Sequence, residues 1–325
     1  MIFNPEHILE QINAQISKAQ FGTEPVELYE PIRYFMQLGG KRLRPLLTVF
    51  GTYLFSDEYE KAILPSLGIE IFHNFTLMHD DIMDKAPLRR NKQTVHEKWD
   101  QNIAILAGDV MLVKAYEYLI KAEASLIPEI LTPFNICAAQ VCEGQQLDVN
   151  FETSDSVDEQ KYLEMIRLKT AVLLGLALEV GAIIGDASPT DRKWIKEAGI
   201  NMGMAFQLQD DLLDVFGNQK KFGKKVGGDI IANKKTFLLI KALVKANKQQ
   251  SQLLNKCLSD VSINDDEKVA TVTRIYQELD IKALTELKIE FYIQEALESL
   301  SKTSSPLYKK NTLKKYFFKL AQREN

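Results

Sequence analysis

The sequence predicts an all-α protein, and three observations support this fold class. Apolar residues recur every three or four positions along most of the chain, which places them on one face of a helix. Segments that alternate apolar and polar residues, as half-buried strands do, are rare. Only 16 glycines and 10 prolines interrupt the 325 residues, so long helical segments remain between the breaks.

The expected helices follow from this periodicity and from the residues that interrupt it. Pro87, Gly108, Pro128, Gly217 and the glycine pair at 227–228 mark breaks between helices. In chain order the helices are expected near residues 5–19, 25–37, 42–55, 60–84, 92–99, 103–123, 127–149, 158–185, 189–216, 233–246 and 250–261, with more in the C-terminal segment.

The composition is that of a globular protein with an ordinary core. Hydrophobic residues make up 46% of the chain and charged residues 26%. The net charge of −4 gives no overall attraction to nucleic acid or to an anionic membrane. No linker rich in Gly, Ser or Pro and no repeat of 20–50 residues is visible, so we expect a single domain over residues 1–325.

Cysteine usage and the N-terminal stretch indicate a cytoplasmic protein without a transmembrane segment. The three cysteines, Cys137, Cys142 and Cys257, are odd in number and lack the spacing of metal ligands. Pro5 and Glu6 stand where a signal peptide needs basic and apolar residues. No apolar run reaches about 18 residues, the length a membrane helix requires.

Two acidic clusters are the main clue to function. "HDDIMD" at 79–84 is echoed by "QDDLLD" at 209–214, and each sequence ends a long apolar helix. On a helix, the first and last aspartates of each set lie about one turn apart, where like charges cost about 0.2–0.5 kcal/mol. A single cluster is more often a solvated helix end, but two copies favour a bound cation.

The type of ligand predicts the cation. Carboxylate oxygens without a Cys-rich or His-rich constellation favour Mg²⁺ over zinc, and Mg²⁺ usually takes its other ligands from water and phosphates. The candidate metal ligands are Asp80, Asp81, Asp84, Asp210, Asp211 and Asp214.

Basic residues recur where a diphosphate would need them. "GGKRLRP" at 39–45 places Lys41, Arg42 and Arg44 at an expected helix start, where backbone N–H groups also favour anions. Taken alone, this motif is explained equally well by a solvated basic turn and by an anion-binding site. The other basic candidates are Arg89, Arg90, Lys169, Lys224 and Lys234.

Together these blocks resemble the trans-isoprenyl diphosphate synthases, or polyprenyl synthetases, in the right order over nearly the whole chain. The blocks are "GGKRLRP", "DDIMD" with "RR", "LAGD" at 106–109, "EGQQLD" at 143–148, "KT" at 169–170 and "FQLQDDLLD" at 206–214. The chain departs from the family at Ala171, where glycine is common, and in the stretch between Lys224 and Lys234.

The resemblance implies an all-α isoprenoid-synthase-type helical bundle around a central elongated cavity, and a homodimer. It implies a head-to-tail 1′-4 condensation of isopentenyl diphosphate with dimethylallyl, geranyl or farnesyl diphosphate. About three Mg²⁺ ions per active site would neutralise the leaving diphosphate. The residues that the resemblance assigns to this step as catalytic are Asp80, Asp84, Arg89, Lys169, Thr170, Gln207, Asp210 and Lys224.

A second, metal-free diphosphate site is implied for isopentenyl diphosphate. The matching positions are Lys41, Arg44, Arg90 and His73, although a histidine on an apolar helix is otherwise more often a core residue. Arg89, Lys169, Lys224 and Lys234 would bind the allylic diphosphate, with Thr170 and Gln207 placing oxygen dipoles beside the carbocation.

Residues upstream of Asp80 are expected to limit product length. Phe75 lies five positions before Asp80, Thr76 four before, and Phe72 eight before, about 12 Å along the helix axis. By resemblance to the family, an aromatic residue five positions before Asp80, here Phe75, together with Thr76 four positions before it, favours a C20 product over C15. The alternative, that both phenylalanines are ordinary core residues, is about equally well supported.

Three other functions stay open. A synthase of longer prenyl chains would need small residues where Phe75 stands. A terpene cyclase usually lacks a second aspartate cluster, and a non-catalytic helical subunit would be expected to lose aspartates or the "RR" pair.

Overall fold

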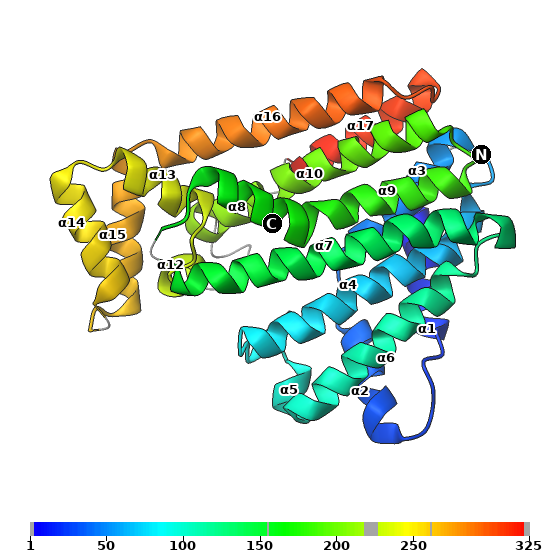
Figure 1. The fold of residues 1–325 in the computed structure, drawn as a ribbon, viewed down its shortest axis with the longest axis horizontal. Coiled ribbons are helices and arrows are strands. Elements are labelled where there is room, and N and C mark those ends of the chain that lie inside the picture. The colour runs from blue at the N-terminus through cyan, green and yellow to red at the C-terminus, as the bar shows by residue number, and fades with distance from the viewer. Residues whose placement is uncertain (1–2, 155, 218–226, 261, 322–325) are drawn as a thin grey trace. The chain divides into compact units, whose positions relative to one another are not determined.

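The structure, a computed structural model, describes residues 3–154, 156–217, 227–260 and 262–321. Within these ranges helices dominate, and the strands are one two-stranded antiparallel hairpin (Figure 1). The all-α prediction is confirmed.

The chain divides into two compact units. Unit 1 comprises the described residues of Met1–Phe134 and Leu176–Lys193, and unit 2 those of Asn135–Gly175 and Trp194–Asn325. The boundaries fall inside helices α7 (Ile127–Thr153), α9 (Val172–Ile184) and α10 (Pro189–Phe216). A single domain over the whole chain stays a prediction.

Unit 1 is built around the long helix α4. Its other elements are α1 (Pro5–Lys18), α2 (Val26–Gln37), α3 (Leu43–Phe55), the 3₁₀ turn η1 (Tyr59–Ala62), β1 (Leu88–Arg89), β2 (Lys92–Gln93), α5 (Val95–Lys98), α6 (Gln101–Leu119) and the 3₁₀ turn η2 (Ala124–Leu126). Helix α4 (Ile63–Met83) packs against both α3 and α6. A side chain at Gly68 would collide with the backbone of Ala115, so this glycine lets α4 and α6 pack closely.

Unit 2 contains the C-terminal helices and a local π-helical turn. Its elements are α8 (Glu159–Ile166), the π turn η3 (Arg167–Ala171), α12 (Gly228–Ile231), α13 (Phe237–Lys245), α14 (Lys248–Ser259), α15 (Asp265–Glu278), α16 (Ile281–Ser301) and α17 (Leu307–Ala321). A β-carbon at Gly144 of α7 would overlap the backbone of Lys169 in η3. The glycine therefore brings α7 against the π turn, and such turns often occur at functional sites.

Two sequence predictions about the elements were wrong, and a third missed a detail. Residues 92–99 are not one helix, because Lys92 and Gln93 pair with β1 before α5 begins. The segment expected as one helix at 158–185 is helical over 159–184, but its middle is the π turn η3 between α8 and α9. Gly108 does not break a helix: it lies inside α6, where the lack of a side chain leaves room for the His79 ring.

Among the residues that the structure describes, no helix has both the length and the hydropathy needed to span a bilayer.

Candidate active site

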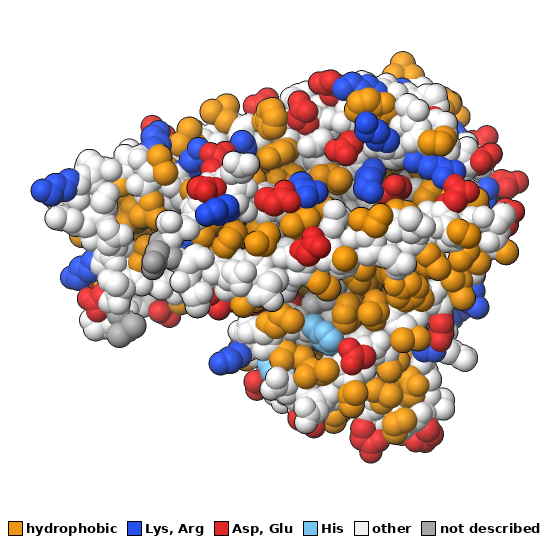
Figure 2. Space-filling view, viewed as in Figure 1, with side chains coloured by type: hydrophobic (Ala, Val, Ile, Leu, Met, Phe, Trp, Pro, Cys, Tyr) orange, Lys and Arg blue, Asp and Glu red, His pale blue; other side chains and the backbone are white. Residues whose placement is uncertain are grey.

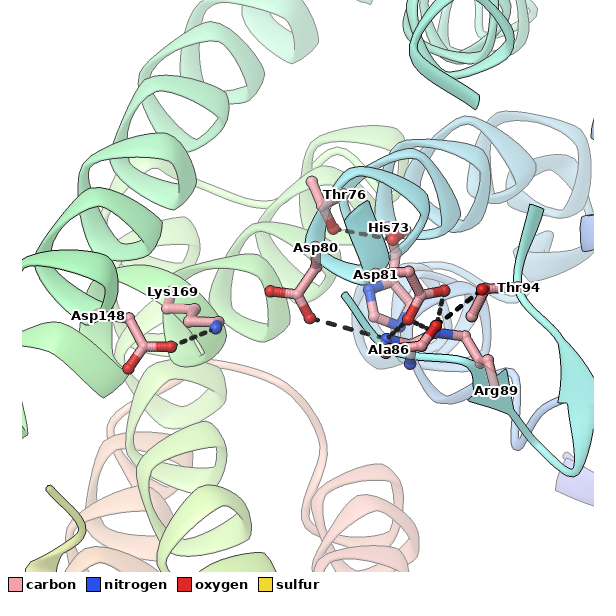
Figure 3. Close-up of polar contacts among 9 residues, drawn as sticks. All are labelled: His73, Thr76, Asp80, Asp81, Ala86, Arg89, Thr94, Asp148 and Lys169. Carbon is pink, nitrogen blue, oxygen red and sulfur yellow. Dashed lines mark hydrogen bonds and ion pairs between the residues drawn. The ribbon is translucent and has the colours of Figure 1, made fainter. Parts of the chain in front are cut away.

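The C-terminal end of α4 presents the first aspartate set. Asp80 is partly exposed, with 18% of its side-chain surface accessible, while Asp81 is buried and Asp84 is exposed as the C-cap. The chain then reverses: the Ala86 N–H donates to the Asp81 carbonyl at 2.9 Å, and the Thr94 hydroxyl donates to the Ala86 carbonyl at 2.7 Å (Figure 3). This reversal brings the β1–β2 hairpin back to the end of the helix.

Arg89 on the hairpin forms a tight ion pair with Asp81. Its Nε lies 2.9 and 2.8 Å from the two carboxylate oxygens, and its Nη2 lies 2.7 Å from Oδ1 (Figure 3). The same Nη2 is 3.7 Å from Asp80 Oδ2. Burial raises the pKa of Asp81, and the Arg89 guanidinium acts against that rise. Asp81 thus anchors Arg89 beside Asp80.

The three cations of "GGKRLRP" have different environments. Arg42 is buried, donates to Glu70 and the Met36 carbonyl at 2.7 Å each, and therefore stabilises the fold. Arg44 Nη1 lies 2.9 Å from His73 Nε2. Lys41 is exposed in the same turn.

Three of the residues predicted to bind isopentenyl diphosphate come together in unit 1. Arg90 donates to the carbonyl of Gly39, whose φ of 83° suits glycine. Burial, followed by the charges of Arg44 and Arg90, holds the pKa of His73 well below its ordinary value. His73 is therefore neutral and accepts a hydrogen bond from Arg44, leaving a cluster of guanidinium groups suited to a phosphate.

The predicted chain-length residues differ in burial. Phe72 is 1% exposed, and its ring centroid lies 5.2 Å from that of Phe134 and 5.7 Å from that of Phe75. Phe75 is only half-buried and lies edge-on to His79 at 4.8 Å. The Thr76 hydroxyl donates to the His73 carbonyl at 2.8 Å (Figure 3). Phe72 is therefore a core residue, whereas Phe75 keeps an accessible surface.

In unit 2, Lys169 of the π turn is paired with Asp148 of α7. Lys169 Nζ lies 2.6 Å from Asp148 Oδ2 (Figure 3). Asp148 was not predicted as a site residue, although "EGQQLD" ends with it. The position of Asp148 at the end of this family block was the sequence feature that could have identified it as a site residue.

A chain of hydrogen bonds links four side chains of unit 2. The Thr170 hydroxyl donates to Gln207 Oε1 at 3.1 Å, and Gln207 Nε2 donates to Asp211 Oδ1 at 3.0 Å. The Tyr162 hydroxyl donates to the other oxygen of Asp211. Burial, aided by the Asp229 and Asp210 charges, raises the pKa of Asp211 to about 8. Sequence reasoning missed Tyr162, which no motif marks.

The remaining residues of the second set end α10. Asp210 is exposed, and Asp214 Oδ2 accepts the Asp229 N–H at 2.9 Å. The Lys234 N–H donates to the Asp229 carbonyl at 2.9 Å, which ties Lys234 to the same turn. Lys224 lies outside the described residues.

The carboxylates fit Mg²⁺ that also binds a phosphate ligand. All candidate donors are oxygens, which a hard cation prefers, and Asp80, Asp84 and Asp210 are accessible to different degrees. Within the ranges that the structure describes, no three acidic, histidine or cysteine side chains converge closely enough to hold a metal ion by themselves. Magnesium bound by one or two carboxylates takes its other ligands from water and substrate phosphates.

Known proteins resemble the chain over most of its length. It is 35% identical over 302 residues to the geranylgeranyl diphosphate synthase of Sulfolobus acidocaldarius, covering 92% of this chain and 91% of the relative. It is 36% identical over 251 residues to the geranylfarnesyl diphosphate synthase of Natronomonas pharaonis, covering 72% and 74%.

The same similarity extends to three-dimensional structure and to a family model. A crystal structure of a geranylgeranyl pyrophosphate synthase matches the whole of both chains with a TM-score of 0.94 and 40% identity. The model of the family "Polyprenyl synthetase" matches residues 25–279. With its aspartate sets, its arginine cluster and these similarities in place, the chain belongs to the polyprenyl synthetase family.

Proposed function

We propose that the protein is a Mg²⁺-dependent prenyltransferase that condenses isopentenyl diphosphate with an allylic diphosphate to form a short-chain all-trans prenyl diphosphate. The observation that carries the proposal is the division of chemistry within unit 1. The end of α4 presents the carboxylates of Asp80 and Asp84, whereas Arg44, Arg90 and neutral His73 form a separate cationic cluster. One environment suits a diphosphate bound through metal ions, and the other suits a diphosphate bound without them.

The first environment serves the allylic substrate. When bound, about three Mg²⁺ ions would neutralise the charge that develops on the departing diphosphate. In unit 1 we assign Asp80 and Asp84 to these ions and Arg89 to the phosphate oxygens of this substrate. For unit 2 the same roles rest on the resemblance to the family alone, Asp210 for the ions and Lys169, Lys224 and Lys234 for the phosphate oxygens.

The second environment keeps isopentenyl diphosphate away from the metal, so that its own diphosphate is not lost. Lys41, Arg44 and Arg90 bind its phosphate oxygens, and His73 orients Arg44 by accepting its N–H. By resemblance to the family, we assign to the oxygen atoms of Thr170 and Gln207, which are hydrogen-bonded to each other, the stabilisation of the positive charge that forms on the allylic carbon.

The direct test uses purified protein with radiolabelled isopentenyl diphosphate and dimethylallyl, geranyl or farnesyl diphosphate. We expect labelled, acid-labile prenyl products only when Mg²⁺ and an allylic primer are both present. Chelation of Mg²⁺ should stop the reaction. Cyclised hydrocarbons from the allylic substrate alone would indicate a terpene cyclase, and no product from any primer would indicate a non-catalytic subunit.

For product length we propose C20, with Phe75 as the residue that limits the growing chain. The accessible part of Phe75 supports this role, whereas the burial of Phe72 does not. A C25 product is the competing outcome, because a relative is a geranylfarnesyl diphosphate synthase. Chromatography of the dephosphorylated products against C15, C20 and C25 standards decides between them.

The two phenylalanines offer a matched pair for this test. Phe75→Ala should lengthen the products with modest loss of stability, because substrate can fill the space that the ring leaves. Phe72→Ala should leave product length unchanged and cost about 3–5 kcal/mol in unfolding free energy, as truncation of a core phenylalanine does. Unchanged products from an active Phe75→Ala enzyme would exclude Phe75 from control of length.

We also propose a homodimer that buries the exposed apolar stripe of α6. Leu106 and Val113 of α6 and Ile120 at its C-cap follow at intervals of seven residues and are 57%, 58% and 46% exposed. On the face drawn in Figure 2, hydrophobic side chains gather over the part of unit 1 where Figure 1 places α6. Such contiguous apolar surface is typical of a protein interface, and two-fold symmetry would pair it with itself.

Light scattering should therefore give a mass of about twice 37.0 kDa. The double variant Leu106→Glu/Val113→Glu should be monomeric, because it places charges in the interface. Leu287→Glu is the matched control, since Leu287 is 63% exposed on α16, outside this stripe. A wild-type monomer at micromolar concentration would contradict the proposal.

A further inference from the structure

Tyr162, Asp211, Gln207 and Thr170 form a hydrogen-bonded chain with a defined direction. All four belong to unit 2: Tyr162 lies on α8, Thr170 in the π turn η3, and the other two on α10. Tyr162 is 2% exposed and Asp211 6%, so water does not compete strongly for their bonds. Gln207 and Asp211 are four residues apart, which places them on the same face of α10.

The direction of the chain follows from what each group can donate. Gln207 Nε2 donates to Asp211 Oδ1 at 3.0 Å, so the NH₂ group of the amide faces the carboxyl group. The amide oxygen then points to Thr170, whose hydroxyl donates to it. The reversed amide would require a proton on Asp211 Oδ1, because an ionised carboxylate has none to place between two acceptor oxygens.

The other carboxylate oxygen of Asp211 is held by Tyr162. The phenol donates to Oδ2 and fixes the rotation of the carboxylate, which in turn fixes the position of Oδ1. Both oxygens of Asp211 therefore accept hydrogen bonds from protein groups, and its role as a metal ligand stays a prediction. In this arrangement Asp211 orients Gln207.

We propose that Tyr162, acting through Asp211, is a positioning residue that keeps the oxygen of Gln207, and not its NH₂ group, directed toward the reacting carbon. This inference rests on the proposed function. A carbonyl oxygen stabilises a nearby positive charge, whereas an N–H in the same place would oppose it. The orientation of one amide therefore changes the sign of its contribution to ionisation of the allylic diphosphate.

The first test is the Tyr162→Phe enzyme, which lacks only the hydroxyl. Its kcat should fall about tenfold, because an interaction that acts in the transition state is weakened. KM for both diphosphates should stay within about twofold. Tyr59→Phe is the control: Tyr59 is also buried but lies in unit 1, among aromatic rings at the start of the chain. A kcat for Tyr162→Phe within about twofold of wild type would overturn the proposal.

A double-mutant cycle separates positioning from general destabilisation. If Tyr162 acts through Gln207, adding Tyr162→Phe to Gln207→Ala should change kcat by less than about twofold. Multiplicative losses in the double variant would show that the two side chains act independently, and this would overturn the proposal.

A spectroscopic measurement needs no turnover. In ¹⁵N-glutamine-labelled protein, the side-chain NH₂ signals of Gln207 are assigned by their loss in Gln207→Ala. They should shift in Tyr162→Phe and not in Tyr59→Phe. Unshifted signals would overturn the proposal even if kcat fell. Shifted signals in a protein without prenyltransferase activity would support the orienting chain and refute the proposed function.

Should Tyr162→Phe fail to fold, Asp211→Asn replaces it in the measurement of kcat and in the spectroscopic measurement. Asparagine keeps the size of the side chain and substitutes an N–H donor for one acceptor oxygen. The Gln207 signals should then shift and kcat should fall at least about tenfold. Unchanged signals and turnover would again overturn the proposal.

Discussion

The two aspartate sets share one sequence pattern, but the structure surrounds them differently. In each set the second aspartate is buried, Asp81 in unit 1 and Asp211 in unit 2. Asp81 is held by a charged partner, the Arg89 guanidinium, only eight residues away on a hairpin. Asp211 is held by neutral donors, Gln207 on its own helix and Tyr162 at a separation of 49 residues.

A repeated sequence motif therefore does not imply a repeated environment. A buried carboxylate can be satisfied by a cation or by neutral donors, and the two solutions have different consequences. Arg89 neutralises Asp81 and remains near Asp80, where it can also bind phosphate. Neutral donors leave the pKa of Asp211 at about 8 and use its oxygens to orient other groups.

The largest expected effect tests what the two sets share. Asp80→Ala and Asp210→Ala should each lower turnover by at least about 100-fold, because each removes a metal ligand at the leaving diphosphate. Circular dichroism and melting should remain near wild type, since Asp210 is exposed and the side chain of Asp80 keeps 18% of its surface accessible. Glu117→Ala, at an exposed surface pair with Lys114, serves as the control. Near-normal turnover of either aspartate variant would refute its metal assignment.

The next effect tests the contrast between charged and neutral partners. Arg89→Ala leaves the buried Asp81 without its cation and should cost about 3 kcal/mol in unfolding free energy. Tyr162→Phe removes one neutral donor from Asp211 and should cost about 1–2 kcal/mol. Urea unfolding of both variants measures the difference. Equal losses would mean that the two environments are energetically equivalent.

A third experiment compares the cations of the two units. Arg44→Ala should raise KM for isopentenyl diphosphate about tenfold and leave KM for the allylic substrate nearly unchanged. Lys169→Ala, which also frees Asp148, should act mainly on the allylic substrate or on kcat. Initial rates with each substrate varied in turn separate the two patterns. If both variants affected both substrates alike, the proposal of two distinct diphosphate sites would be refuted.

The smallest expected effect concerns the pH dependence of unit 1. Burial and the charges of Arg44, Arg90, Arg89 and Arg42 lower the pKa of His73 well below its ordinary value of 6.5. The folded state therefore binds fewer protons than the unfolded state. The contribution of His73 to stability is complete above pH 6.5 and is lost as the pH falls below it.

Melting temperatures between pH 5 and 8 provide the measurement. His73→Gln, which cannot be protonated and keeps an acceptor for Arg44, should lose less stability in acid than wild type. The same acid sensitivity in both proteins would assign the effect to other groups.

The helical fold, both aspartate sets and the family could be predicted from the amino-acid sequence. These properties are local, since a helix face and a DDxxD spacing depend on residues within one or two turns. For the same reason the ends of α2, α3 and α10 were predicted within one residue. Local spacing also marked "EGQQLD", although not the role of Asp148 within it.

Packing between distant segments assigns different roles to residues that look alike in the sequence. Arg42 and Arg44 stand two positions apart in one motif, yet the first pairs with buried Glu70 and the second with His73. Phe72 and Phe75 lie on one helix, and packing against Phe134 made the first a core residue.

The contacts that complete the candidate site are also tertiary. Lys169 meets Asp148 across 21 residues, and Tyr162 meets Asp211 across 49. The π turn likewise depends on a neighbouring helix, because it packs against Gly144 of α7. The position of Gly108 inside α6 depends on the His79 ring of α4. Periodicity encodes which face of a helix is buried, but not which distant side chain will be packed against that face.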